Sequence, residues 1–271
     1  MKRTFALAFA AFAAFAVCIS ARAENRKTLN DRAAAHIAAG TAPSHVRSML
    51  GVPSWGGRGG SYTAFAASPH VEILARHYGW WGTERYYSGT RVVSTNRFAL
   101  ADWARKNGFS EYEISQACIG DVQISLVDNA IPDSCIPYFA SDEILARRFG
   151  RPYGVQGWMS NQNGNLALNV SPVTFYDSWR SWMNATRYVA ANRLHVRCDI
   201  VGAAAGRTYH DVHVGDSGHP VVLDIGAGRM VVCSDCSSAT RGPPLTHPIT
   251  IRIIQALAES VGDTLKIWDG N

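Results

Sequence analysis

The sequence has few charged residues and almost no surplus of either sign. Of its 271 residues, 17% are charged and 47% hydrophobic. This composition is typical of a globular protein and excludes a disordered, collagen-like or coiled-coil chain as the main state. The net charge is +5, from 26 basic and 21 acidic residues, but Lys2, Arg3 and Arg22 lie in the first 23 positions. Without these three residues, the net charge falls to about +2, which does not indicate binding to nucleic acid.

Long hydrophobic runs are also absent, except near the N-terminus. Phe5 to Ile19 are apolar, follow Lys2-Arg3 and precede Ala21-Arg22-Ala23, a small-x-small cleavage pattern. The run is short for a membrane span, so an uncleaved anchor is the less favoured interpretation. We therefore expect residues 1–23 to be a signal peptide. The mature protein, a monomer without membrane attachment, is expected to be secreted or periplasmic.

Cysteines are few, and their number in the mature chain is odd. Cys18 leaves with the signal peptide, and five remain: Cys118, Cys135, Cys198, Cys233 and Cys236. An exported chain permits disulfides, so at most two are expected. Cys118 with Cys135 would close a short loop, and Cys198 could pair with Cys233 or Cys236. The connectivity stays open at this point.

The chain divides into an N-terminal extension and one larger domain. Residues 24–50 are polar and Ala-rich, and Gly51–Ser61 is Gly-rich, so we expect an extension or pro-segment over 24–60 and a domain over 61–271. Short strand-like runs cover 71–78, 90–95, 121–128, 166–176, 194–201, 219–225 and 229–233. A helix is expected from a Thr250 cap to about residue 261, before Gly262. The pattern predicts an all-β body with a C-terminal helix.

Three short motifs carry the chemistry. Gly215-Asp216-Ser217-Gly218-His219-Pro220 puts a serine between glycines, which permits a tight turn with backbone N–H groups close to a carbonyl. His77 ends the apolar run that starts at Val71, and Asp121 opens the alternating run Asp121-Val-Gln-Ile-Ser-Leu. A serine, a base and an orienting carboxylate form the set needed for nucleophilic catalysis.

These motifs resemble those of the chymotrypsin-like (trypsin-like) serine peptidases. Gly215–Gly218 is similar to the family's Gly-Asp-Ser-Gly, Ala75-Arg76-His77-Tyr78 to its Ala-Ala-His-Cys, and the run from Asp121 to its Asp-Ile-Ala-Leu-Leu. The order His77, Asp121, Ser217 is also that of the family. The resemblance implies two antiparallel six-stranded β-barrels, a C-terminal helix, and a serine endopeptidase that acts on peptides or proteins without a cofactor or metal.

The resemblance also implies a role for each matching residue. Ser217 would be the nucleophile, His77 the general base and Asp121 the group that orients it. The backbone N–H groups of Gly215 and Ser217 would form the oxyanion hole. Asp211 would select basic side chains at the base of the primary pocket, and Ser234 would line the cleft.

The sequence departs from the family at several positions. Tyr78 and His213 replace family cysteines, and the chain has no Ile-Val-Gly-Gly start with which Asp216 could pair after activation. A catalytically inactive homologue that binds a partner is therefore the alternative. Rival groups are His70 as the base, Asp128 or Asp133 as the carboxylate, and a metal site at His210 and His213 with Cys233 and Cys236. The two histidines would point to opposite faces of an extended strand, which disfavours the metal site.

Overall fold

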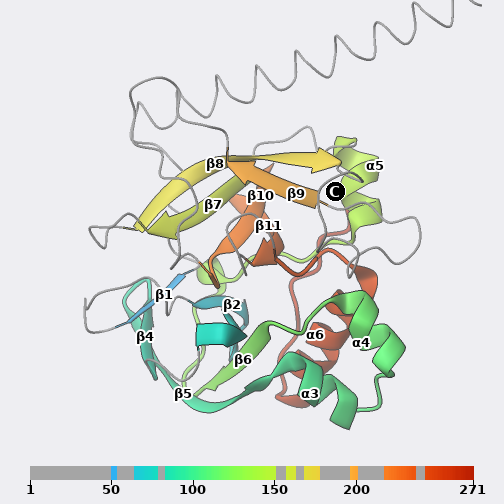
Figure 1. The fold of residues 1–271 in the computed structure, drawn as a ribbon. Coiled ribbons are helices and arrows are strands. Elements are labelled where there is room, and N and C mark those ends of the chain that lie inside the picture. Colours follow the sequence, from blue (N-terminus) through green and yellow to red (C-terminus); the bar gives the residue numbers. More distant parts are fainter. Residues whose placement is uncertain are drawn as a thin grey trace, which may run out of the picture.

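Strands of the chain form two separate groups, with helices packed around them (Figure 1). The computed structural model describes residues 50–53, 64–78, 83–150, 157–162, 168–177, 196–200, 217–235 and 242–271. Every strand predicted from the sequence is present, with boundaries shifted by a few residues. Alternation of apolar side chains marks the body of a strand but not its ends, so the strands are located correctly and only their boundaries shift.

The first group is a closed, antiparallel barrel of six strands. In chain order they are β1 (Leu50–Pro53), β2 (Ala64–Ser68), β3 (Val71–Ala75), β4 (Glu84–Tyr87), β5 (Thr90–Ala99) and β6 (Val122–Val127). Their order around the barrel is β1-β2-β3-β6-β5-β4, and β1 closes it by pairing with both β2 and β4. The barrel therefore includes Leu50–Pro53, which lie within the expected extension and supply its first strand.

A buried ion pair lies on the inner face of this barrel. Side chains alternate along β3, and Glu72 lies on the face opposite Val71 and Ile73, which pack outward against helix α6 (Pro248–Ser260). Glu72 Oε2 accepts a hydrogen bond of 3.0 Å from Arg85, and Glu72 Oε1 accepts one of 2.9 Å from the Tyr87 hydroxyl. A Cβ at Gly51 would lie 2.7 Å from the Tyr87 hydroxyl, so only glycine lets β1 pass this network.

The second group is a five-stranded antiparallel sheet. It contains β7 (Gly157–Gln162), β8 (Leu168–Asp177), β9 (Val196–Ile200), β10 (Pro220–Gly226) and β11 (Arg229–Asp235), in the order β11-β10-β7-β8-β9. The expected second six-stranded barrel is not evident within the described ranges. The fold is nevertheless all-β and of the chymotrypsin-like class, with a barrel followed by an antiparallel sheet and a C-terminal helix.

Three further α-helices were not expected. They are α3 (Leu100–Lys106) and α4 (Glu111–Ala117), which connect β5 to β6, and α5 (Asp142–Phe149), which lies between β6 and β7 in the sequence. Ser110 and Glu113 form a capping box that starts α4, and the Ser141 hydroxyl caps α5. None of the helices in the described segments is long and apolar enough to cross a membrane.

The C-terminal helix α6 is confirmed, but its predicted cap is wrong. His247 occupies the N-cap position and its side chain accepts a hydrogen bond from the Ile249 N–H, with Pro248 as the first helical residue. Thr250 instead lies inside the first turn and is fully buried. Its hydroxyl donates to the Ala117 carbonyl at the end of α4, 3.1 Å away.

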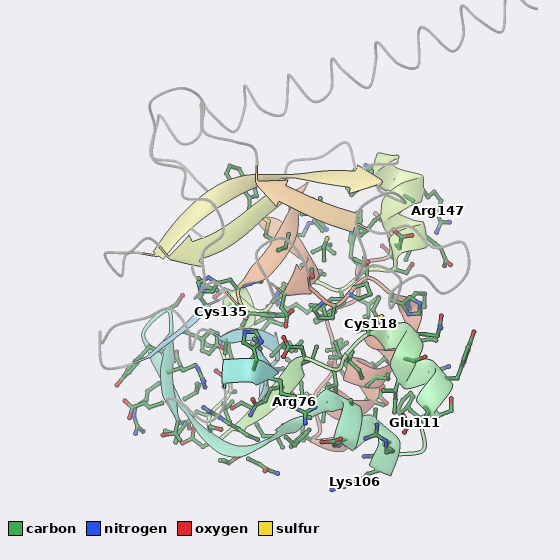
Figure 2. All side chains as sticks on the ribbon, viewed as in Figure 1. Arg76, Lys106, Glu111, Cys118, Cys135 and Arg147 are labelled. Atoms are coloured by element: carbon green, nitrogen blue, oxygen red, sulfur yellow. The ribbon has the colours of Figure 1, made fainter. Side chains whose placement is uncertain are left out.

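The described cysteines do not form the expected disulfides. Cys118, Cys135 and Cys233 are thiols, and each donates a hydrogen bond, to Ser115 O, Ser88 Oγ and Val231 O respectively. Figure 2 shows Cys118 beside α4 and Cys135 in a different part of the molecule, so the Cys118–Cys135 disulfide is wrong. Cys233 is a thiol, so the expected pair with Cys198 is not formed. Cys236 lies outside the described residues.

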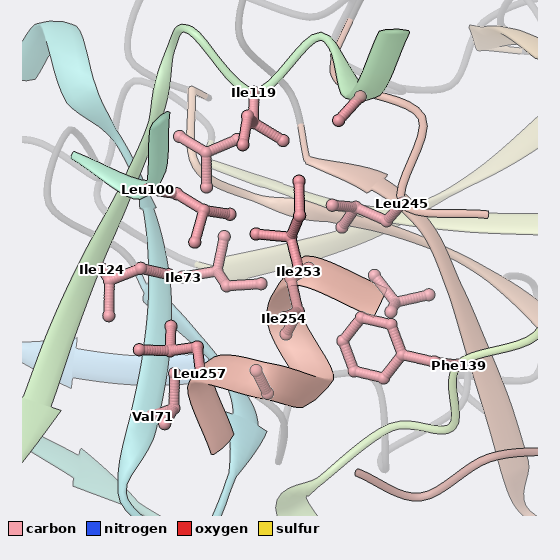
Figure 3. Packing of buried hydrophobic residues seen from close by; sticks show 14 of the residues in the cluster. Val71, Ile73, Leu100, Ile119, Ile124, Phe139, Leu245, Ile253, Ile254 and Leu257 are labelled. Carbon is pink, nitrogen blue, oxygen red and sulfur yellow. The ribbon is translucent and has the colours of Figure 1, made fainter. Parts of the chain in front are cut away.

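One hydrophobic cluster joins the barrel, the helices and the second sheet. It includes Val71, Ile73 and Ile124 from the barrel, Leu100 from α3, Ile119, Phe139 and Leu245 from connections, and Ile253, Ile254 and Leu257 from α6 (Figure 3). Val222 and Val232 add the second sheet to the same cluster. Burial of each such side chain contributes about 1.5–3 kcal/mol to the free energy of unfolding, so α6 is a main stabilising element.

Candidate active site

His77 and Asp121 meet where β3 ends and β6 begins. The Nδ1 atom of His77 lies 2.7 Å from Asp121 Oδ2, and the backbone N–H of His77 donates to Asp121 Oδ1 at 3.2 Å. Both carboxylate oxygens therefore contact the same residue. Contact with both the ring and the backbone restrains the imidazole in position and in rotation.

The strand pairing explains why these two residues meet. In the β3–β6 ladder, Ala75 pairs with Val122, and the Arg76 N–H donates to the Asp121 carbonyl at 2.7 Å. β3 stops at Ala75, and Arg76–Tyr78 form a 3₁₀ turn, so His77 is not part of the strand as expected. The turn rotates His77 off the β3 face and toward Asp121. Period-2 alternation alone would have put it on the face of Val71 and Ile73.

The pair is accessible to solvent. The side chains of His77 and Asp121 are 40% and 35% exposed, so their mutual attraction is screened and contributes little to folding stability. The arrangement fixes the imidazole instead. With Nδ1 held by a carboxylate, a proton from a reacting group is taken by Nε2, as a general base in acyl transfer requires.

Ser217 lies in a turn that leads directly into β10. Gly218 adopts a left-handed conformation with φ of 85°, which glycine tolerates, and Pro220 starts the strand two residues later. Ser217 is 8% exposed and His219 is fully buried. Gly215, Asp216 and Asp211 lie outside the described residues, so their expected roles in the oxyanion hole and the primary pocket remain predictions.

The outer edge of β11 is already paired over most of its length. Tyr138 forms a parallel bridge with Val231, and the Leu245 N–H donates to the Cys233 carbonyl. Ser234 is 9% exposed, and its hydroxyl contacts the Pro243 carbonyl at 2.9 Å. A role for Ser234 in lining the cleft remains a prediction.

Close packing at Gly242 shapes the same edge. A Cβ at this position would lie 1.4 Å from the Asp235 carbonyl oxygen and 2.3 Å from Ser234 Oγ. At this distance from the end of β11, only glycine fits at position 242.

A second histidine–aspartate pair, which the sequence did not indicate, joins His70 to Asp263. His70 Nδ1 lies 2.8 Å from Asp263 Oδ1, while the His70 N–H and the Ser68 hydroxyl donate to Oδ2 at 2.6 and 2.7 Å. Asp263 is buried, and the contact connects the β2–β3 turn to the residues after α6. The serine here binds the aspartate rather than the histidine, so the three groups are not in the order needed for nucleophilic catalysis.

The other rival groups have different partners. Asp128 Oδ1 accepts a hydrogen bond from the Val93 N–H at 2.7 Å, and Asp133 forms an ion pair with Lys266. No group of three potential metal ligands occurs among the described residues. His210 and His213 lie outside them.

Comparisons with known proteins give structural neighbours only. No family model and no curated protein matches the chain. Among solved structures, the chain is similar to the passenger domain of plasmid-encoded toxin, an autotransporter enterotoxin of enteroaggregative Escherichia coli. The identity is 13% over 76% of this chain, and the TM-score is 0.43. The match spans only 22% of the toxin domain.

Two further matches are inactive forms of the murine norovirus NS6 protease. A chimeric form is 17% identical over 73% of this chain and 95% of that one, with a TM-score of 0.38. A form with a C-terminal extension is 16% identical over 73% and 92%, with a TM-score of 0.35. All three TM-scores lie below 0.5, so the fold class rests on the strand order and the C-terminal helix of the chain itself.

Proposed function

We propose that this chain is an exported serine endopeptidase that cleaves peptide bonds through an acyl-enzyme intermediate. Ser217 is the nucleophile, His77 the general base and Asp121 the orienting carboxylate. The observation that carries the proposal is the 2.7 Å hydrogen bond between His77 Nδ1 and Asp121 Oδ2. It joins two residues that are 44 positions apart in the sequence and that the sequence motifs predict as a base and its carboxylate.

The mechanism follows from the roles of these groups. His77 Nε2 accepts the Ser217 hydroxyl proton as Oγ bonds to the scissile carbonyl carbon, and the carbonyl oxygen becomes an oxyanion. The N–H groups of Gly215 and Ser217 stabilise that oxyanion, and loss of one such donor typically costs about 10²–10³ in rate. The imidazolium then protonates the leaving amine, and water repeats the sequence on the acyl-enzyme.

Asp121 supports both proton transfers. It holds the tautomer in which Nε2 can accept a proton, and its charge stabilises the imidazolium that follows. The hydrogen bond from the His77 backbone N–H to Asp121 Oδ1 supports this role because it keeps the carboxylate aligned with the ring. The proposal needs no metal or cofactor.

Substrate preference and location are further parts of the proposal. Asp211 at the base of the primary pocket selects Arg or Lys side chains by charge, and Ser234 lines the neighbouring cleft. An Asp211→Ser variant is expected to lose this preference in a peptide library while it keeps Ser217 reactive. Residues 1–23 direct export, so the mature chain is expected to start at Glu24 in secreted or periplasmic material.

The direct test is active-site labelling of the chain from Glu24 with a fluorophosphonate probe. The expected result is stoichiometric labelling that maps to Ser217 and disappears in Ser217→Ala. Labelling of a different serine would contradict the proposal. If folded protein, checked by circular dichroism, is not labelled at all, the proposal fails and the alternative of a catalytically inactive partner-binding homologue is favoured.

A further inference from the structure

The end of α4 is held by side chains at the point where the chain turns toward Asp121. The last carbonyl groups of a helix lack partners within the helix. Here Cys118 Sγ donates to the Ser115 carbonyl, and the Thr250 hydroxyl donates to the Ala117 carbonyl at 3.1 Å. Thr250 belongs to α6, is fully buried and is 133 residues away from Ala117 in the sequence.

The residue after α4 has a conformation that only glycine adopts freely. Cys118 has φ of 54° and ψ of 33°, in the left-handed region. In this region, the Cβ of an L-residue approaches its own carbonyl oxygen, which costs energy. The turn at Cys118 therefore carries a conformational cost, and the hydrogen bond from Thr250 helps to offset it.

The three residues that follow are fixed as well. Ile119 is fully buried in the main cluster, and Figure 3 shows it together with Leu100 and Ile253. The Val122 N–H donates to the Ile119 carbonyl at 3.1 Å, which closes the turn that contains Asp121. The segment from Ala117 to Val122 is thus held at one end by the hydrogen bond from Thr250 and at the other by the β3–β6 ladder.

The Asp121 carboxylate itself is held by few contacts. Its side chain is 35% exposed, and its two oxygens contact the backbone N–H and the ring of His77. Because Asp121 lies between Ala117 and Val122, the position of its carboxylate relative to His77 depends in part on the backbone of this segment. A shift of the α4 end is therefore expected to change the His77–Asp121 distance.

We propose that Thr250 is a positioning residue for Asp121, which sets the His77–Asp121 hydrogen bond by anchoring the end of α4. This inference rests on the proposed function for its effect on reactivity, but its geometric part does not. Thr250→Val keeps the shape of the side chain and removes the donor, and Thr250→Ser keeps the donor.

The test uses proton NMR of the full mature chain together with fluorophosphonate labelling. Histidine ring N–H protons that are shared with carboxylates resonate far downfield, so His77 and His70 should give two such signals. Each signal is assigned by its loss in His77→Ala or His70→Ala. In Thr250→Val, the His77 signal should shift and broaden while the His70 signal stays unchanged. In Thr250→Ser, both signals should stay as in the wild type.

Labelling should change in parallel with the His77 signal. We expect the rate constant for labelling to fall about tenfold in Thr250→Val, which corresponds to about 1.4 kcal/mol, and to recover in Thr250→Ser. If Thr250→Val does not fold, Thr250→Ala provides the same comparison with a smaller side chain.

Two results would overturn the inference. The first is a Thr250→Val protein whose His77 signal and labelling rate equal those of the wild type. The second is an equal change in the His70 and His77 signals, because Asp263 follows α6 and both signals would then report general damage to that helix. Failure of wild-type labelling with the His77 signal present would count against the proposed function alone.

Discussion

The protein contains two histidine–aspartate pairs that look alike in their hydrogen bonds and differ in their surroundings. In each pair, Nδ1 and the backbone N–H of the histidine contact the two oxygens of one carboxylate. Asp263 is buried and also binds the Ser68 hydroxyl, whereas Asp121 is one-third exposed. A buried carboxylate with three donors stabilises the fold. An exposed one, which holds a single histidine at a strand end, is suited to orient a base.

Replacement of each histidine by alanine should give the largest difference in acylation rate between the two pairs. His77→Ala is expected to lower the rate of Ser217 acylation by about 10⁶-fold, since loss of a general base has this effect in serine peptidases. His70→Ala should keep the rate within about threefold, because it acts only on the β2–β3 turn. Fluorophosphonate labelling rates measure both. A loss of labelling in His70→Ala with His77→Ala still active would exchange the roles of the two pairs.

Replacement of each carboxylate by its amide should give the next largest difference. Asp121→Asn is expected to reduce acylation about 10⁴-fold with little loss of stability, because the amide favours the wrong tautomer of His77. Asp263→Asn should instead lower the free energy of unfolding by about 1.5–3 kcal/mol with acylation unchanged. Urea unfolding and labelling, run on both variants, distinguish these outcomes. A destabilised Asp121→Asn protein would show that its pair is structural.

The two histidine–aspartate pairs also show how much of the candidate site can be predicted from the sequence. The motif order that resembles the chymotrypsin-like peptidases predicted His77 and Asp121 as base and carboxylate, and the β3–β6 ladder brings the two residues together. Asp263 was not predicted, since its partner lies 193 residues away and no local pattern connects them. Contacts of this kind depend on how α6 is placed against the barrel.

The helices α3 and α4 show a different limit. Each is seven residues long, too short for a clear periodic pattern, although Ser110-Glu-Tyr-Glu113 carries the capping-box spacing that starts α4. That signal was available in the sequence. The cysteine count led to the wrong prediction of a Cys118–Cys135 disulfide, because a count does not show which cysteines lie close together. Cys118 caps α4, whereas Cys135 lies in a separate 3₁₀ turn.

A smaller effect should follow from removal of the third donor to Asp263. Ser68→Ala is expected to lower the free energy of unfolding by about 1 kcal/mol, because a buried acceptor loses one hydrogen bond. Ser115→Ala, on the exposed face of α4, is the matched control and should change it by less than about 0.5 kcal/mol. Equal values for the two variants would show that Asp263 does not need the Ser68 hydroxyl.

The smallest effect is expected at Cys118, three residues before Asp121. Burial raises the pKa of its thiol to about 11. A raised pKa favours the neutral form, so at pH 8 only about one molecule in a thousand carries the nucleophilic thiolate. Iodoacetamide at pH 8 should therefore modify Cys118 slowly and leave labelling of Ser217 unchanged, as measured by mass spectrometry. Rapid alkylation of Cys118 with loss of labelling would point to chemistry at the thiol.

The position of α6 has a consequence for the order in which the protein can form. The outer face of the first barrel, with Val71 and Ile73, is covered by residues from the last part of the chain, Ile253, Ile254 and Leu257. During synthesis this apolar face has no cover until α6 has emerged, and transiently exposed apolar surface of this kind promotes aggregation. A chain that stops before α6 would be left with the apolar surface that leads to aggregation.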